Sequence, residues 1–237
     1  VIEYIIKCPD CHTELQRKDG DAKHYCPNEF GCPTQITGKI QHFVSRKAMN
    51  IDGLGAESVE LLFNNALIGN IADLYELKVE DLIPLDRMAE KSAQNMINGL
   101  EESKNIPFEK VLFALGIRYV GETVAKKLAR HYKNIDALQE ATFEELITVD
   151  EIGEKIAESV ILYFDNEGNQ LLIERLKGFG LRMSLDEAEN EQQTDLLKGL
   201  VFVVSGVFHQ LSRNELKKSI EDHGAKVTGS ISKKTNF

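Results

Sequence analysis

The amino-acid sequence predicts a mainly helical protein built from three unlike parts. These are a small four-cysteine zinc-binding module, a tandem array of short helical repeats, and a partial α/β module at the end. Three observations predict them: all four cysteines lie within the first 32 residues, one glycine-bearing motif recurs four times, and residues 199–237 suggest a strand, a helix and a strand. We therefore expect separate modules rather than a single core.

The four cysteines follow the spacing C-x2-C-x14-C-x5-C and are Cys8, Cys11, Cys26 and Cys32. A C-x2-C pair on a tight turn aims two sulfurs at one point, and a second pair completes a tetrahedron of thiolates that suits Zn²⁺. Four protein ligands leave no open coordination position, so the metal is expected to be structural, in a zinc finger spanning residues 8–43. Two disulfides are the alternative reading, and His12 or His24 are alternative ligands.

Residues 44–183 carry one motif four times. Aligned on its glycine, the motif reads GLGAESVELL, RMAEKSAQNM, YVGETVAKKL and EIGEKIAESV, and the aligned residues are 34, 32 and 32 positions apart. The aligned residues are Gly55, Ala89, Gly121 and Gly153. Apolar residues four and seven positions later share one helical face. Residues 70–89 also align without gaps to residues 134–153, so we predict a duplicated pair of helical modules.

Each copy, with a helix, a tight apolar-x-Gly turn and a second helix, resembles the helix-hairpin-helix family. The resemblance implies that backbone amides at the start of the second helix grip a DNA phosphate, while glycine permits the turn and a close approach. A helix N-terminus favours an anion without any cationic side chain, so a net charge of −10 does not exclude DNA. The expected DNA-binding residues are Gly53, Gly55, Lys91, Arg118, Gly121, Thr123, Lys126, Gly153 and Lys155.

Two alternatives remain open for this array. The first is that the glycines merely terminate helices in an all-α bundle. The second concerns one copy, in which Ala89 replaces the glycine and Asp86 lies close by. We expect that hairpin to be a packing copy rather than a phosphate clamp.

The end of the chain changes character at residue 184. Residues 184–198 are acidic and lack aromatic residues, which predicts a flexible linker. Then LVFVVSGVF predicts a buried strand, SRNELKKSIEDHG a helix capped by Ser212 and ended at Gly224, and AKVTGSISKKTNF a second, parallel strand. Residues 199–237 resemble the first part of a BRCT domain, which implies a protein- or DNA-contact module. We interpret Ser205 and Gly206 as a turn rather than a phosphate pocket.

The order of these modules resembles the C-terminal part of bacterial NAD⁺-dependent DNA ligases. The segments CPDC, MNIDGLG, LGIRYVGETVAKKLA and VTGSISKKTN carry this resemblance, which covers essentially the whole chain. It implies that residues 1–7 are the tail of an oligonucleotide-binding barrel and that the chain is a piece of a longer protein. No Lys-x-Asp-Gly motif occurs, so the adenylated lysine and the sites for NAD⁺ and Mg²⁺ are expected elsewhere, and this piece alone should be inactive.

The resemblance predicts a DNA-binding region of an enzyme that seals single-strand nicks during replication and repair. Its partner would be nicked double-stranded DNA, gripped by the backbone without sequence preference, and the protein would be a cytoplasmic monomer with protein contacts through the BRCT-like module. No window approaches the roughly 18 apolar residues of a membrane span, so no membrane partner is expected. A non-catalytic repair adaptor and a purely structural helical array are the alternatives.

Overall fold

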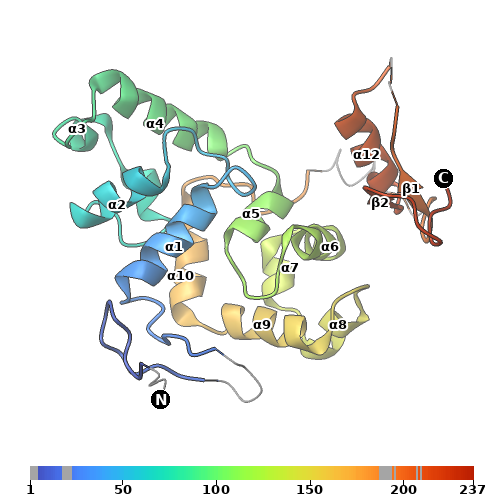
Figure 1. The fold of residues 1–237 in the computed structure, drawn as a ribbon, viewed down its shortest axis with the longest axis horizontal. Helices are drawn as coiled ribbons and strands as arrows, with labels where there is room; N and C mark the ends of the chain where they lie inside the picture. Colours follow the sequence, from blue (N-terminus) through green and yellow to red (C-terminus); the bar gives the residue numbers. More distant parts are fainter. Residues whose placement is uncertain (1–4, 18–22, 187–193, 195, 207, 209) are drawn as a thin grey trace. The chain divides into compact units, whose positions relative to one another are not determined.

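The computed structural model describes residues 5–17, 23–186, 194, 196–206, 208 and 210–237. The chain divides into two compact units, Val1–Ser184 and Leu185–Phe237 (Figure 1). Residues 1–4 of the expected barrel tail, and residues 187–193 and 195 of the expected linker, lie outside the described residues. Within the described ranges, no helix has the length and apolar character needed to cross a bilayer.

The first unit begins with a module of little regular structure. One antiparallel bridge joins Lys7 to Glu14 around the first cysteine pair, and a second joins Gln16 to Tyr25 between the two pairs. Helix α1, Pro33–Val44, follows directly, and its N-cap is Cys32. Proline at the first helical position suits this junction, because that position has no hydrogen-bond partner for an amide.

Short helices form the rest of the first unit, and Figure 1 shows them in two groups with α1 and α10 between them. Their bounds are α2 Ala56–Asn64, η1 Asp73–Glu76, α3 Val79–Leu82, α4 Glu90–Ser103, α5 Phe108–Ala114, α6 Glu122–Tyr132, α7 Ile135–Gln139, α8 Phe143–Thr148, α9 Glu154–Phe164 and α10 Glu167–Gly178. The prediction of a mainly helical fold is confirmed.

The four sequence repeats are four structural repeats. Helices α2, α4, α6 and α9 each begin one residue after the aligned position, so that position is their N-cap. The apolar residues four and seven positions later are all buried, with no more than 2% of their surface exposed. They are Val59, Leu62, Ala93, Met96, Ala125, Leu128, Ala157 and Val160. Burying such a stripe stabilises each hairpin by roughly 1.5–3 kcal/mol for each large side chain.

The two halves of the array repeat each other in detail. Helices η1 and α3 of the first half correspond to α7 and α8 of the second, and the equivalent Leu74 and Leu138 are 0% and 1% exposed. Within each half, the aligned segment begins at an asparagine whose side-chain oxygen accepts a backbone N–H. Asn70 accepts from Ala72 at 2.9 Å, and Asn134 accepts from Ala137 at 2.8 Å. The predicted duplication is therefore present in three dimensions.

Helix α10 contacts both halves. The Arg175 guanidinium donates to Asp73 Oδ1 at 2.8 Å and to Glu76 Oε1 at 2.6 Å, both on η1. Two residues on, the Lys177 ammonium pairs with Asp136 on α7. The helix that follows the last hairpin thus holds the equivalent segments of the two halves together.

The second unit is a strand–helix–strand unit, as predicted. Its elements are β1 Val201–Val203, α12 Arg213–Asp222 and β2 Lys226–Thr228, and the two strands pair in parallel. Ser212 caps the helix by accepting the Glu215 N–H at 3.2 Å, and Gly224 ends it with a φ of +88°.

The first strand of the second unit differs from expectation. The sequence predicts a buried strand, but β1 is only half-buried along its length. A sheet of two described strands packed on one helix cannot cover both of its faces. Gly206 after the strand has a φ of +106°, a conformation that glycine adopts readily, which agrees with a turn at this position.

Candidate metal centre and nucleic-acid interface

The four cysteine sulfurs converge on one point, within 4.8 Å of one another. The Sγ atoms of Cys11 and Cys26 are 3.4 Å apart, and those of Cys8 and Cys32 are 3.9 Å apart. Tetrahedral zinc with bonds of about 2.3 Å places its sulfurs roughly 3.8 Å apart, so the set fits Zn²⁺. Disulfide sulfurs lie about 2.05 Å apart. All four thiols are unbridged, so the disulfide reading is wrong.

The structure also argues against His12 and His24 as metal ligands. Among the described residues, the ligand cluster contains cysteines alone, and both His12 and His24 are exposed outside it. Within the cluster, the Thr13 hydroxyl lies 3.2 Å from the Cys11 sulfur, and hydrogen bonds with the Thr13 side chain and backbone lower the pKa of Cys11 to about 6, whereas burial raises the pKa of Cys26. A lowered pKa favours the thiolate form that binds a metal.

Backbone hydrogen bonds hold the cysteines in two turns. The Cys8 N–H donates to the Thr13 carbonyl at 2.8 Å, and the Cys32 N–H donates to the Asn28 carbonyl at 3.1 Å. The Thr34 hydroxyl on α1 donates to Asp10 of the first turn at 2.8 Å. Because Cys32 is both a ligand and the N-cap of α1, a metal bound here would fix the start of the helix that leads to the first hairpin.

All four hairpins share one backbone geometry. In each four-residue turn the amide of the last residue donates to the carbonyl of the first, at 3.0–3.5 Å. The third residue of every turn has a left-handed φ. These residues are Gly53 at +81°, Arg87 at +59°, Tyr119 at +65° and Glu151 at +64°. For a residue other than glycine this conformation costs roughly 1–2 kcal/mol.

This geometry corrects one expectation about the aligned glycines. Gly55, Gly121 and Gly153 have φ values of −90°, −82° and −90°, which any residue adopts, so they are not needed for the turn. Ala89 accordingly fits the same position at −78°. The requirement for a left-handed residue falls two positions earlier. What the three glycines provide is room, since an added Cβ would meet nothing within 4 Å.

The aligned positions face solvent, while their neighbours face the core. Gly55, Ala89, Gly121 and Gly153 are exposed, and the preceding Leu54, Val120 and Ile152 are no more than 5% exposed. None of the four helices behind them receives a hydrogen bond from an N-cap side chain. An uncapped helix start presents amide N–H groups and a positive dipole end to an external acceptor. This arrangement supports phosphate binding at the hairpins.

The predicted side-chain contacts fall into two groups. Lys91, Thr123 and Lys155 are exposed and occupy the same place, the second residue of α4, α6 and α9. The other two lie on the third module, with Arg118 exposed in the turn and Lys126 half-buried on α6. The repeat therefore brings three of the predicted polar residues to equivalent corners on different hairpins.

The sequence reasoning missed two features of this surface. Lys127 on α6 pairs with Asp150 at 2.7 Å and Glu151 at 3.1 Å, and so ties the third module to the fourth hairpin. Tyr119 is exposed at the tip of the third hairpin, at the turn position that Gly53 occupies in the first hairpin. Gly53 was the sequence signal for this position, because the copies share one turn and a glycine in one copy indicates a left-handed residue at the same place in the others.

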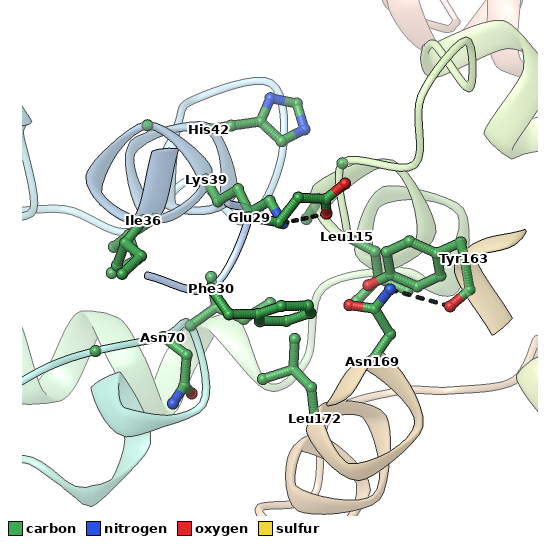
Figure 2. A pocket seen from close by; sticks show the side chains of 16 residues that line it. Glu29, Phe30, Ile36, Lys39, His42, Asn70, Leu115, Tyr163, Asn169 and Leu172 are labelled. Atoms are coloured by element: carbon green, nitrogen blue, oxygen red, sulfur yellow. Dashed lines mark hydrogen bonds and ion pairs between the residues drawn. The ribbon is translucent and has the colours of Figure 1, made fainter. Parts of the chain in front are cut away.

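A cavity of about 240 Å³ marks where the zinc module meets the helices (Figure 2). Phe30 of the zinc module points into it toward Leu172 of α10, and the Lys39 ammonium lies 5.0 Å from the Phe30 ring centroid. On the other side, the Asn169 side-chain amide donates to the Tyr163 carbonyl at 3.0 Å. A wider groove of about 710 Å³ is lined by both the zinc module and the third hairpin. The zinc module thus packs beside the second half of the array.

Four protein families match separate parts of the chain. The NAD-dependent DNA ligase C4 zinc finger domain matches residues 7–33, and the BRCA1 C Terminus (BRCT) domain matches residues 192–237. The SAM-like helix-hairpin-helix tandem matches residues 45–102, and the helix-hairpin-helix motif matches residues 110–173. The two helical matches coincide with the two halves of the array.

Curated bacterial proteins named DNA ligase are similar to the chain along its whole length. The Flavobacterium johnsoniae protein is 63% identical over 237 residues, which is 100% of this chain and 36% of that protein. The Flavobacterium psychrophilum protein is 60% identical over 99% of this chain and 35% of its own length, and the Bacteroides fragilis protein 54% over 100% and 36%. The chain therefore spans about a third of the length of these relatives.

Proposed function

We propose that the chain is a region of an NAD-dependent DNA ligase and that it grips nicked duplex DNA for sealing. Its whole length aligns with bacterial DNA ligases, and residues 7–33 match the C4 zinc finger of the NAD-dependent enzymes. The observation that carries the proposal is the fourfold repeat of an exposed, uncapped helix start behind a tight turn. The amide N–H groups at these helix N-termini would bind backbone phosphates, which are the same in every nucleotide. Binding would therefore be independent of base sequence.

Backbone and side-chain groups of the hairpins have different roles in this proposal. Backbone amides at the starts of α2, α6 and α9 donate to phosphate oxygens, and Gly55, Gly121 and Gly153 leave space for close approach, with Gly53 shaping the first turn. Lys91, Arg118, Lys126 and Lys155 add positive charge, and the Thr123 hydroxyl adds a donor. Ala89 makes the second hairpin a weaker clamp, because its methyl group stands where the others have none.

Zinc in the four-cysteine site would act as a structural cross-link. By holding Cys32 at the start of α1, it orients the helix that leads into the first hairpin. Folding and metal binding are then linked, since few large apolar side chains hold the module otherwise.

For the longer protein we propose an NAD⁺- and Mg²⁺-dependent DNA ligase, a polydeoxyribonucleotide synthase whose adenylated lysine lies outside this chain. This chain alone would bind DNA without catalysing ligation. We place the protein in the bacterial cytoplasm with the nucleoid, as a monomer, with the BRCT-like unit available for protein contacts. The ligase zinc finger at residues 7–33 favours this reading over a repair adaptor.

The test is fluorescence anisotropy of the zinc-loaded chain with labelled nicked duplex, titrated at several salt concentrations. We expect binding at low salt and equal affinity for duplexes of different sequence. Amide donors release no counterions, so four cations would give a slope of log K against log salt no steeper than roughly −4. An absence of binding at low salt, or a strong sequence preference, would contradict the proposal.

A further inference from the structure

Tyr119 at the tip of the third hairpin has an exposed aromatic side chain that the shared turn does not require, since Gly53, Arg87 and Glu151 form the same turn. Its φ is +65°, and the residue is 50% exposed. A bulky residue is disfavoured in the left-handed region, whereas glycine adopts it freely, as Gly53 does at the same point of the first hairpin. The backbone of Tyr119 is therefore in a conformation that tyrosine disfavours, while half of the residue's surface stays exposed.

The ring forms one side of an aromatic–cation pair. The Arg118 guanidinium carbon lies 4.9 Å from the centroid of the Tyr119 ring, within the distance for a cation–π interaction. Both residues belong to the turn that leads to the exposed Gly121, which precedes α6 and gives it no side-chain cap. The tip thus presents an apolar surface and a positive charge beside a helix start suited to phosphate.

The other hairpins differ at this position. Arg87 of the second hairpin pairs with Asp86 at 3.7 Å, and Glu151 of the fourth pairs with Lys127 at 3.1 Å. Of the four hairpin tips, the third is the one that carries an aromatic ring. An apolar contact at this array would therefore belong to the third hairpin.

We propose that Tyr119 is a DNA-contact residue whose ring packs against the deoxyribose next to the phosphate at the start of α6. The inference rests on the proposed function and extends it to an apolar contact. The chemical group joined directly to a backbone phosphate is the sugar, whose C–H face is apolar. Bases in a duplex stay stacked inside, so a ring beside a backbone clamp meets sugar first.

Replacement of Tyr119 by glycine separates this role from folding. The variant Tyr119→Gly removes the ring and supplies a residue that favours the left-handed turn, so its melting temperature should equal or exceed that of the wild type. Its Kd for nicked duplex should rise about fivefold, the loss expected for one aromatic contact. Tyr119→Phe should bind within about twofold of the wild type, because it keeps the ring.

The matched control is Arg87→Gly, which makes the same change at the same turn position of the second hairpin and should leave Kd within about twofold. Wild-type affinity in Tyr119→Gly would overturn the contact while leaving the proposed function intact. A loss in Tyr119→Phe equal to that in Tyr119→Gly would assign the contact to the hydroxyl and overturn the apolar contact. A larger loss on single-stranded than on nicked DNA would indicate base stacking and overturn the sugar assignment. If the wild type binds no duplex at low salt, both proposals fail.

Discussion

The first hairpin pair and the second pair have the same backbone but carry different groups where they face solvent. The first pair has Gly55 and Ala89 at its helix starts, and the second has Gly121 and Gly153. The buried leucines and the left-handed turns are alike in both. The fold therefore determines the turn and the core stripe, and contact residues have to be judged one hairpin at a time.

Charge separates the two pairs further. Residues 51–110 contain 5 Lys and Arg against 12 Asp and Glu, and residues 111–180 contain 8 against 12. Both halves are acidic, but the second has more cations to place around a phosphate and two glycine corners rather than one. We expect the second pair to contribute more to DNA affinity. Four predictions test this contrast, beginning with the largest effect.

The largest effect should follow loss of the metal. In Cys32→Ser one thiolate ligand is lost at the N-cap of α1, so zinc content should fall and residues 8–43 should lose their ordered structure. Zinc assay and hydrogen exchange would follow both changes. Amide protection should fall in α2, which follows α1 in the chain, before it falls in α9. Unchanged zinc content would refute the ligand assignment.

The next effect is on binding. Gly121→Val and Gly153→Val should each weaken binding to nicked DNA about tenfold, the loss of one charge-assisted contact. Both glycines have ordinary φ values and open space, so the fold should tolerate valine. Ala89→Val in the first pair is the matched control and should change Kd less than about threefold. Equal losses in all three variants would remove the distinction between the pairs.

A smaller effect concerns the helix that joins the two halves. Arg175→Ala removes two ion pairs with η1 of the first half and should lower the free energy of unfolding by about 1–2 kcal/mol, allowing for partial exposure. Lys177→Ala removes a pair with the exposed Asp136 of the second half and should cost less than about 1 kcal/mol. Urea denaturation measures both. The reverse order would show that α10 holds the second half more firmly.

The smallest effect is a pH dependence in the second half. The Thr142 amide donates to the Glu145 carboxylate at 2.9 Å, and hydrogen bonds with Thr142 lower the pKa of Glu145. A lowered folded-state pKa means that this stabilisation is present above the unfolded pKa and is lost as pH falls through the folded value. Glu145→Gln should therefore melt below the wild type at neutral pH and approach it in acid. A constant difference at every pH would refute the cap.

Features set by local spacing could be predicted from the sequence. The four-cysteine cluster, the four repeats, the buried stripe that includes Val59 and Leu128, and the Ser212 cap each depend on residues close together in the chain. Periodicity and capping chemistry record such neighbours directly.

Other features could not be predicted, because they depend on how distant segments pack. The pair formed by Arg175 and Asp73 joins residues 102 positions apart, and the cavity around Phe30 needs several helices in place. The left-handed turn position was hidden for a different reason. Only the copy with Gly53 shows it by residue type, while Tyr119 adopts it against its own preference.

The shared left-handed turn has a consequence for how such arrays diversify. Glycine, arginine, tyrosine and glutamate all occupy its third position, so the neighbouring helices, rather than the residue itself, impose the backbone there. The side chain at the tip can thus change while the backbone of the hairpin stays the same. A protein engineer could therefore exchange the side chain at the second or third corner, Arg87 or Tyr119, and change what that corner binds without changing the scaffold.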